Sequence, residues 1–383
     1  MSIPVSKPNY GFHEIYNGIN ALITGKLSGH SGSNISKFET SLSKRFARDN
    51  AICVNSGTSA LLLAARVLNI GPGDEVLVSS YTNMATIFPI LQLGATPVPI
   101  DVEIDSWNMC PIDLRKCVTK KTKAIFVVHI FGLPAKMEEI MKVAREHKLS
   151  VIEDCAEAHG ATINNQIVGT FGDLACFSFY SNKLVSTGEG GAVLTNNREY
   201  AQKLRDLRNL SFGDFNKFIH KSDGYNFRMT NFQAGIGIAQ LRKLDKTIKK
   251  KKKIAKKYGK VFKNIKHIQL PIEPAGYSNV YWMYKIVLET PDLVSKVRSM
   301  LLDHGIETRP GFIPLSDQQN LIELFNLSLR STPIASKIGV TSLYLPSGPR
   351  ISILKINKAA KLTKAFIINH YLHANDMNLV NKK

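Results

Sequence analysis

Short runs of apolar residues alternate along residues 50–200 with segments in which the apolar positions recur at helical spacing. The short runs favour buried strands, and they lie at residues 76–80, 96–101, 124–130, 150–154, 175–180 and 190–195. The helical spacing is found at residues 59–68, 84–93, 136–147 and 198–207. Strands that alternate with helices form βαβ units, and near-continuous apolar strands are covered on both faces. The pattern therefore predicts an α/β fold with a mostly parallel sheet between helices.

The pattern changes after a long helical pattern at residues 231–262. Beyond it, residues 281–289 are typical of a strand, residues 293–304 of a helix, and the C-terminal stretch of one more helix. We therefore predict a large domain over residues 1–264, which includes an N-terminal arm, and a smaller α+β domain over residues 265–383.

The chain is basic, with a formal net charge of +20 over 383 residues. Clustered lysine and arginine can neutralise nucleic-acid phosphates, but here they are spread along the chain without a nucleic-acid-binding motif. Five consecutive lysines at residues 249–253 are interpreted as a solvated helix surface. A positive field also attracts small anions. We expect no nucleic-acid partner, and the charge gives modest support for an anionic substrate.

No stretch reaches the roughly 18 consecutive apolar residues that a membrane span needs, and the N-terminus lacks the pattern of a secretory signal. A cytoplasmic location without a membrane partner is therefore expected. The cysteines stand singly, without a Cys-x-x-Cys pair, which favours buried thiols over structural zinc or disulfides. No metal site is predicted.

The first chemical motif is NSGTSALLLAA at residues 55–65. Gly57 permits a tight turn after a strand that ends near Val54, and Ser56, Thr58 and Ser59 can cap the following helix. The free N–H groups of a helix N-terminus bind anions such as phosphate. Taken alone, the motif is weak evidence for a phosphate site, because an ordinary helix cap also explains it.

The second motif is VIEDCAEAHG at residues 151–160, in which an apolar strand ends at Glu153 and Asp154. Ligands of parallel α/β sheets bind outside the carboxyl ends of the strands. A carboxylate there can bind a cation, a ribose hydroxyl or a protonated ring nitrogen, or Asp154 can simply cap a helix. His129 and His159 are interpreted as structural or supporting residues.

The third motif, SFYSNKLVSTGEGGAV at residues 178–193, is the most specific of the three. Lys183 follows an apolar strand in a loop whose closely spaced glycines exclude a helix. A lysine at that edge can form an imine with an aldehyde cofactor, although a surface lysine beside a flexible turn has the same local pattern.

Together the three motifs supply a phosphate site, a carboxylate and a lysine, which are the groups that pyridoxal phosphate requires. An ionised Asp154 would keep the ring nitrogen protonated, so that the ring can accept electrons from a carbanion. Lys183, displaced by the substrate amine, would then be placed to move a proton.

At these residues the chain resembles the DegT/DnrJ/StrS family of sugar aminotransferases, which have the fold-type I architecture. The resemblance runs over nearly the whole chain and includes NSGTSALLLA, IEDCAEAHGA, GTFGDLACFSFYSNKLVSTGEGGAV, GYNFRMTNFQAGIG, GIETRPGFIP and LPSG. Within the family the chain is most similar to the GDP-perosamine synthase group, in SYTNMATIF, SFYSNK, STGEGGAV and NVYWMY.

The resemblance implies a role for each matching residue. Lys183 matches the Schiff-base lysine and Asp154 the partner of the pyridinium nitrogen. Gly57 and Thr58 match the phosphate-binding turn, and Ser178 matches a phosphate-binding serine.

Four further positions carry expectations. Asn226 matches an asparagine that reaches the phosphate from the other subunit, which implies a homodimer with a shared active site. Arg309 is expected to contact the substrate. Many family members carry an aromatic residue that stacks on the cofactor in place of Asn83, and Gln beside the cofactor hydroxyl in place of Glu157.

The resemblance implies a transamination in two halves, with L-glutamate as the amino donor. The first expectation for the acceptor is GDP-4-keto-6-deoxymannose, which would yield GDP-perosamine, and a UDP- or dTDP-linked analogue is the alternative. Two other functions stay open: a pyridoxal-phosphate-dependent sugar dehydratase, which the presence of Lys183 disfavours, and a non-catalytic basic binding protein.

Overall fold

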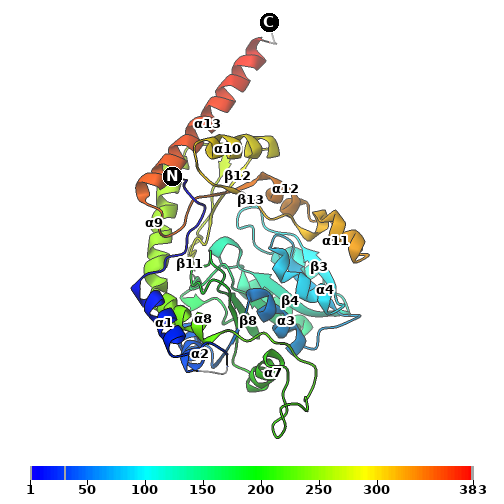
Figure 1. The fold of residues 1–383 in the computed structure, drawn as a ribbon. Coiled ribbons are helices and arrows are strands. Elements are labelled where there is room, and N and C mark those ends of the chain that lie inside the picture. Colours follow the sequence, from blue (N-terminus) through cyan, green and yellow to red (C-terminus); the bar gives the residue numbers. More distant parts are fainter. Residues whose placement is uncertain (1, 30–31, 381–383) are drawn as a thin grey trace.

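The computed structural model describes residues 2–29 and 32–380, and only the backbone from residue 373 onward. A seven-stranded sheet lies at the centre of the larger part of the molecule (Figure 1). Its strands, in spatial order, are β1 (Asn50–Val54), β9 (Gly191–Thr195), β8 (Leu174–Ser178), β5 (Ser150–Asp154), β4 (Thr122–Val128), β2 (Glu75–Ser79) and β3 (Thr96–Ile100). Only β9 runs antiparallel to its neighbours. The predicted α/β fold with a mostly parallel sheet is confirmed.

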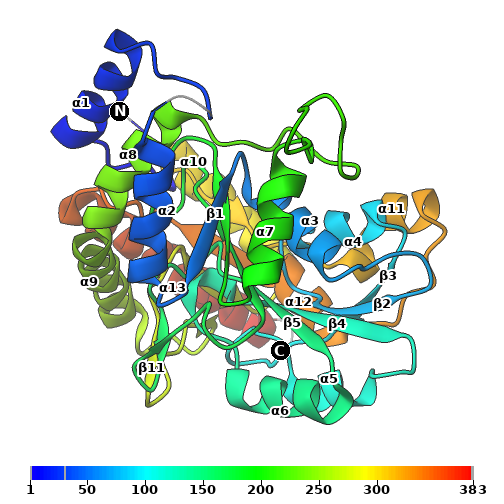
Figure 2. The same cartoon turned by 90° about the horizontal axis from the view of Figure 1, so that it is seen from below.

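Helices cover both faces of this sheet, because successive side chains of each strand point to opposite sides. On β5, Ile152 packs in one hydrophobic cluster with α3 (Gly57–Val67), whereas Val151 packs in another with α6 (Met137–His147). Figure 2 shows α3 and α4 on one side of the strands and α5 and α6 on the other. The remaining covering helices are α2 (Asn34–Arg45), α4 (Phe88–Gln92), α5 (Pro111–Lys116) and α7 (Arg198–Arg208).

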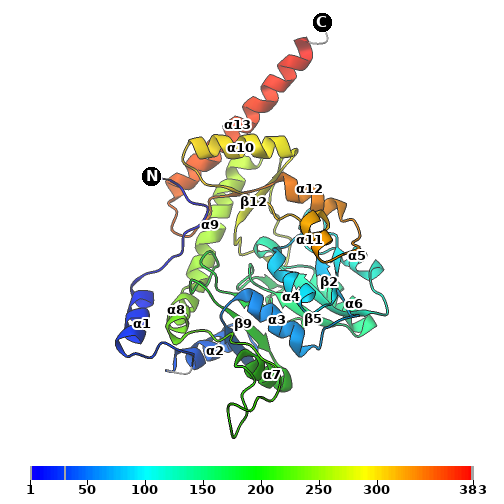
Figure 3. The ribbon, with the colours of Figure 1, turned by 45° about the vertical axis from the view of Figure 1, so that its right-hand side comes forward.

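A second, antiparallel sheet has the strand order β10 (Ile268–Gln269), β12 (Tyr284–Leu288), β14 (Ser342–Leu345) and β13 (Arg309–Pro310). It shares a hydrophobic core with α10 (Pro291–Asp303), α9 (Leu244–Phe262) and α13 (Ile353–Val380). Smaller elements are α11 (Gln319–Leu324), α12 (Pro333–Thr341), and the strands β6 (Thr162–Ile163), β7 (Gln166–Ile167) and β11 (Tyr277–Ser278). Figure 3 shows α9 running from the large sheet toward α10 and α13. The domain boundary between residues 264 and 265 stays a prediction.

The helical pattern at residues 231–262 forms two helices, not one. The helix α8 (Asn231–Arg242) is followed by Lys243, with φ −95° and ψ −4°, which separates it from α9. The two helices pack on different partners: α8 lies against α1 (Phe12–Ile23) and α2, whereas α9 supplies side chains to the second core. A break lets each helix follow its own packing surface.

The prediction that the lysine run is a solvated surface is wrong at one position. Lys249, Lys250 and Lys253 are exposed, but Lys251 is only 2% exposed. Its Nζ donates hydrogen bonds to the carbonyl and the hydroxyl of Ser347, at 2.6 and 3.1 Å. Helical periodicity turns one residue of any such run toward the core, where it needs a hydrogen-bond acceptor.

Along the described residues, every helix is too short or too polar to cross a membrane. The cytoplasmic location stays a prediction.

Candidate active site

A cavity of about 550 Å³ lies at the carboxyl ends of β5 and β8 and extends to the second sheet. This is the edge at which ligands of open α/β sheets bind. Its wall from the large sheet includes the predicted site residues Gly57, Thr58, Asn83, Asp154, Glu157, Ser178 and Lys183. Its wall from the later part of the chain includes Trp282, Arg309, Phe312 and Tyr344.

Lys183 lies in the loop after β8, with its side chain only 12% exposed. Its Nζ is 3.9 Å from the ring centroid of Trp282 and 4.0 Å from Oε1 of Glu157. The indole N–H of Trp282 donates a 3.0 Å hydrogen bond to the carbonyl of Asn182, which fixes the ring against the loop. Burial lowers the pKa of Lys183, and the carboxylates of Glu157 and Asp154 oppose that shift. A lowered pKa increases the neutral, nucleophilic fraction of the amine.

Asp154 ends β5 on the face that α3 covers, and its side chain is buried. Its Oδ1 accepts the N–H of Ala156 at 3.0 Å, and its Oδ2 accepts the hydroxyl of Thr86 at 2.9 Å. Burial raises the pKa of Asp154, while these hydrogen bonds and the charge of Lys183 lower it. A carboxylate has about four acceptor positions, so further capacity remains for a cationic group in the cavity.

Glu157 lies beside Asp154 and is buried as well. Its Oε2 accepts the backbone N–H of Phe131 at 2.8 Å. Phe131 adopts a left-handed conformation, with φ 54°, which a bulky residue rarely does and which directs its N–H to the carboxylate. Burial raises the pKa of Glu157 to about 7, against the opposing charge of Lys183.

The N-terminus of α3 forms the polar floor of the cavity. Ser56 caps the helix by accepting the N–H of Ser59 at 3.0 Å, which leaves the first-turn N–H groups of Gly57 and Thr58 without a helical acceptor. A Cβ atom on Gly57 would lie 2.7 Å from Cβ of Ser178, closer than side chains approach. Glycine is therefore required to bring the helix terminus beside Ser178, and these donors fit an anion.

Asn83 and Arg309 also line the cavity, in more exposed positions. Oδ1 of Asn83 accepts the N–H of Ala85 at 2.9 Å and so caps a short 3₁₀ turn. Arg309, on β13, is 65% exposed and lies 3.2 Å from the carboxylate of Glu307. Asn226 is exposed and does not line this cavity. The described residues thus bring together every predicted site residue except Asn226.

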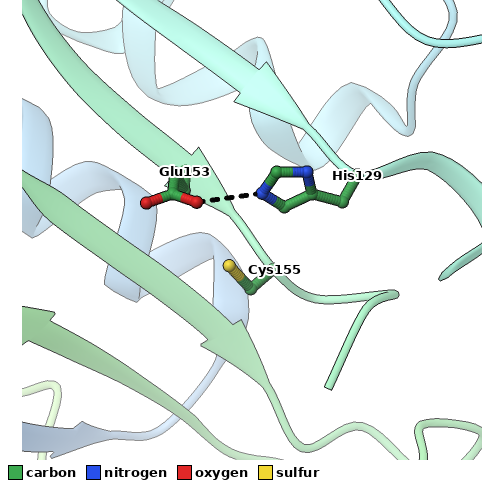
Figure 4. A group of neighbouring side chains, drawn as sticks. All are labelled: His129, Glu153 and Cys155. Carbon is green, nitrogen blue, oxygen red and sulfur yellow. Dashed lines mark hydrogen bonds and ion pairs between the residues drawn. The ribbon is translucent and has the colours of Figure 1, made fainter. Parts of the chain in front are cut away.

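His129, Glu153 and Cys155 form a buried group on the opposite side of β5 from Asp154, with ligand atoms within 4.8 Å of one another (Figure 4). Nε2 of His129 lies 3.1 Å from Oε2 of Glu153, and Nδ1 accepts the N–H of Ala135 at 3.1 Å, so Nε2 carries the donated proton. The carboxylate also accepts three backbone N–H groups from residues 169–172. Because these lone pairs are already committed, the group supports the strand and its loop, and it does not suit a metal ion.

His159 lies behind the lysine loop, where its Nδ1 accepts the N–H of Val185 at 3.3 Å. Burial lowers the pKa of His159 to about 3, so the ring is neutral and supports the loop, as expected of a structural or supporting residue.

Sequence reasoning missed Trp282, Phe312 and Tyr344 as cavity residues. They follow Lys183 by about a hundred residues or more. Trp282 and Phe312 lie within segments that carry the family resemblance, but no local pattern assigns any of the three to the cavity.

Comparison with known proteins places the chain among aminotransferases. The sequence profile described as the DegT/DnrJ/EryC1/StrS aminotransferase family matches residues 12–361. The chain is 36% identical to the GDP-perosamine synthase of Escherichia coli O157:H7 over 351 residues, which cover 91% of this chain and 94% of that protein. It is 38% identical to the UDP-N-acetyl-3-dehydro-alpha-D-glucosamine 3-aminotransferase of Acidithiobacillus ferrooxidans over 310 residues, which cover 81% and 82%. The crystal structure of Streptomyces venezuelae DesV in complex with a ketimine intermediate is 31% identical, with a TM-score of 0.85 and coverage of 92% and 94%.

Proposed function

Because the chain belongs to the DegT/DnrJ/EryC1/StrS aminotransferase family, we propose that it transfers the amino group of L-glutamate to a nucleotide-linked 4-keto-6-deoxy sugar. Membership of this family makes the protein a pyridoxal-phosphate-dependent sugar-nucleotide aminotransferase. The proposed acceptor is GDP-4-keto-6-deoxymannose and the product GDP-perosamine, supported by the relative named GDP-perosamine synthase. The relative named for a UDP-linked sugar keeps a UDP-linked acceptor as the second candidate, beside a dTDP-linked one.

The observation that carries the proposal is that one cavity holds a buried lysine, a buried carboxylate and an unpaired helix N-terminus. These residues fit pyridoxal phosphate. Lys183 would hold its aldehyde as an imine, and Asp154 would face the ring nitrogen. The N–H groups of Gly57 and Thr58 and the hydroxyl of Ser178 would bind the phosphate. When bound, the cofactor supplies an electron sink for the carbon that loses its proton.

The chain's own groups would carry out the proton transfers and the positioning. The burial that lowers the pKa of Lys183 favours its neutral amine, which, once freed by the amino donor, would be placed to take up the substrate proton and later return it. Trp282 covers this amine at 3.9 Å and excludes water from one side of it. Arg309, at the rim and largely exposed, would bind an anionic group of the sugar nucleotide.

We further propose that two copies of the chain form a homodimer that shares each active site. Asn226 is exposed and lies outside its own cavity, where a second copy could use it to reach the phosphate. The helix α1 turns Gly18 and Ala21 inward and presents an apolar stripe to solvent: Phe12, Ile15, Tyr16, Ile19, Leu22 and Ile23. A stripe of this kind needs cover, and a second copy would supply it.

The test begins with the visible absorption spectrum of the protein loaded with pyridoxal phosphate, before and after L-glutamate is added. We expect a bound chromophore whose band changes with glutamate. GDP-, UDP- and dTDP-linked 4-keto-6-deoxy sugars are then supplied separately, and the products are identified by mass spectrometry. An amino sugar from the GDP substrate supports the proposal. Amination of a UDP- or dTDP-linked sugar instead would show that the proposed GDP-linked acceptor is wrong. A dehydrated product would indicate a sugar dehydratase. A protein that binds no chromophore would favour the non-catalytic basic binding protein.

A further inference from the structure

A second lysine, the second residue of β12, lies behind the cavity. Lys285 has no exposed surface, and its Nζ donates a 3.2 Å hydrogen bond to the hydroxyl of Tyr81. Over the described part of the chain, no carboxylate oxygen lies within 4.0 Å of this nitrogen. An ammonium group without a close counter-ion is costly to bury, so a lysine at this position indicates a role beyond packing.

Three aromatic rings form a cage around this amine. Nζ of Lys285 lies 3.8 Å from the ring centroid of Trp107, 4.3 Å from that of Tyr81 and 5.1 Å from that of Phe131. The faces of such rings attract a cation, and the attraction is stronger where water is excluded. Burial lowers the pKa of Lys285 well below its ordinary value, and the carboxylate of Glu157 opposes this shift. Burial thus favours the neutral amine, whereas the cage and Glu157 favour its charged form.

Two of the caging residues are linked to the acids of the cavity. Phe131 donates its backbone N–H to Glu157 at 2.8 Å. Tyr81 lies five residues before Thr86 in the same loop and 3₁₀ turn, and the hydroxyl of Thr86 donates to Asp154 at 2.9 Å. The amine of Lys285 thus contacts the two segments that orient the two carboxylates.

The electrostatic surroundings connect Lys285 with Glu157 more closely than with the catalytic lysine. The charged or titratable groups that act on Glu157, or on which Glu157 acts, are Lys183, Asp154, Lys285, Tyr81 and Tyr344. The pKa of Lys183 is shifted by burial and by the charges of Glu157 and Asp154, and Lys285 is not among these causes. An effect of Lys285 on Lys183 would therefore pass through Glu157.

We propose that Lys285 is a positioning residue of this active site, a caged cation that holds Tyr81 and Phe131 in place and favours the ionised form of Glu157 beside Lys183. This role rests on the pyridoxal-phosphate-dependent reaction and is independent of the sugar substrate. Lys285 does not line the cavity, so it acts through Glu157 without contact with the reacting atoms.

The test removes the charge while the shape of the side chain is kept, with Lys285→Met. Loss of this cation favours proton binding at Glu157, whose negative charge then no longer stabilises the protonated imine at Lys183. The midpoint of a pH titration of the visible absorption, measured on the protein loaded with pyridoxal phosphate alone, should therefore move downward, by an amount on the order of one pH unit. Lys285→Gln keeps a donor to Tyr81 without the charge and should give the same shift. In a Glu157→Gln background, Lys285→Met should leave the midpoint unchanged.

Lys251→Met is the matched control, because Lys251 is also a buried lysine outside the cavity but, among the described residues, hydrogen-bonds only to Ser347 and does not act on Glu157. This control should leave the midpoint unchanged and should lower the unfolding temperature of the apoprotein, since two hydrogen bonds are lost. Lys285→Met should preserve or raise that temperature, because an apolar side chain then fills the aromatic cage.

A downward shift that disappears in the Glu157→Gln background supports the role of Lys285. The proposal is overturned if both charge-removing variants titrate like the parent protein, or if the shift persists without Glu157. A wrong choice of sugar cannot produce either result, because no sugar is present. If the protein bound no cofactor, the apoprotein comparison would still decide: a loss of stability in Lys285→Met as large as in Lys251→Met would assign a structural role and overturn the proposal.

Discussion

Glu157→Gln is expected to stabilise the apoprotein at neutral and alkaline pH and to leave its stability unchanged in acid. Burial raises the pKa of Glu157 from its usual 4.5 to about 7. Ionisation is therefore harder in the folded chain than in the unfolded one, and it weakens the fold as the pH rises from 4.5 toward 7. Glutamine resembles the protonated acid and can still accept the N–H of Phe131 at the same position.

The size of the effect follows from the difference between the two pKa values. Below pH 4.5 the acid is protonated in both states, and the variant should match the parent protein. Above pH 7 the parent has lost stability that the glutamine variant keeps, up to about 3 kcal/mol for a pKa raised from 4.5 to about 7. The gain should develop between these two pH values.

The assay is urea denaturation of the apoprotein from pH 4 to pH 8.5, followed by circular dichroism, for both proteins. Glu153→Gln is the matched control, because Glu153 is also buried but its pKa is lowered, whereas the pKa of Glu157 is raised. Although burial raises the pKa of Glu153, hydrogen bonds from His129 and backbone N–H groups lower it overall. Its contribution to stability is present above pH 4.5 and is lost as the pH falls, so this variant should be destabilised most at neutral pH.

The reasoning would be refuted if the Glu157→Gln variant had the same stability difference from the parent at every pH. It would also be refuted if Glu157→Gln and Glu153→Gln followed the same pH trend. In either case Glu157 would be ionising without the desolvation that its burial implies.

Three further predictions concern the cofactor, the substrate and assembly. Gly57→Ala should weaken binding of pyridoxal phosphate by roughly 1–3 kcal/mol, because the new Cβ would lie 2.7 Å from Cβ of Ser178; an unchanged dissociation constant by fluorescence titration would contradict this. Arg309→Ala should raise KM for the sugar nucleotide and leave cofactor binding unaltered, and steady-state kinetics that show the parent KM would remove Arg309 from the substrate site. The double change Ile15→Asp and Ile19→Asp should yield a monomer by light scattering, since it places charges on the apolar stripe of α1; a dimer that persists would place the interface elsewhere.

Local sequence was sufficient for the alternating strands and helices of the large sheet and for the large-sheet wall of the cavity, although it did not show the break between α8 and α9. The alternation of apolar strands and helices identified the mostly parallel sheet, and the rule that ligands bind at its carboxyl edge selected Asp154 and Lys183. Gly57 was recognisable because a helix that starts directly after a strand leaves free N–H groups at that edge. These features depend on residues close together in the chain.

Local sequence could not predict which side chains are buried by segments that lie far away in the chain. Lys251 belongs to a run of lysines, and only the packing of α9 against the loop at Ser347 distinguishes it from its exposed neighbours. Trp282 reaches Lys183 only because the second sheet lies against the cavity.

The sequence alone determined the chemical groups of this protein and the order in which strands and helices present them, because hydrophobic periodicity and motif spacing are local properties. The tertiary structure decided which of these groups share one water-poor environment. Glu157 and Lys285 are far apart in the chain, and each is an ordinary charged residue until folding buries both. Desolvation and cation–aromatic contacts then set their protonation, and both depend on segments that meet only in the folded chain.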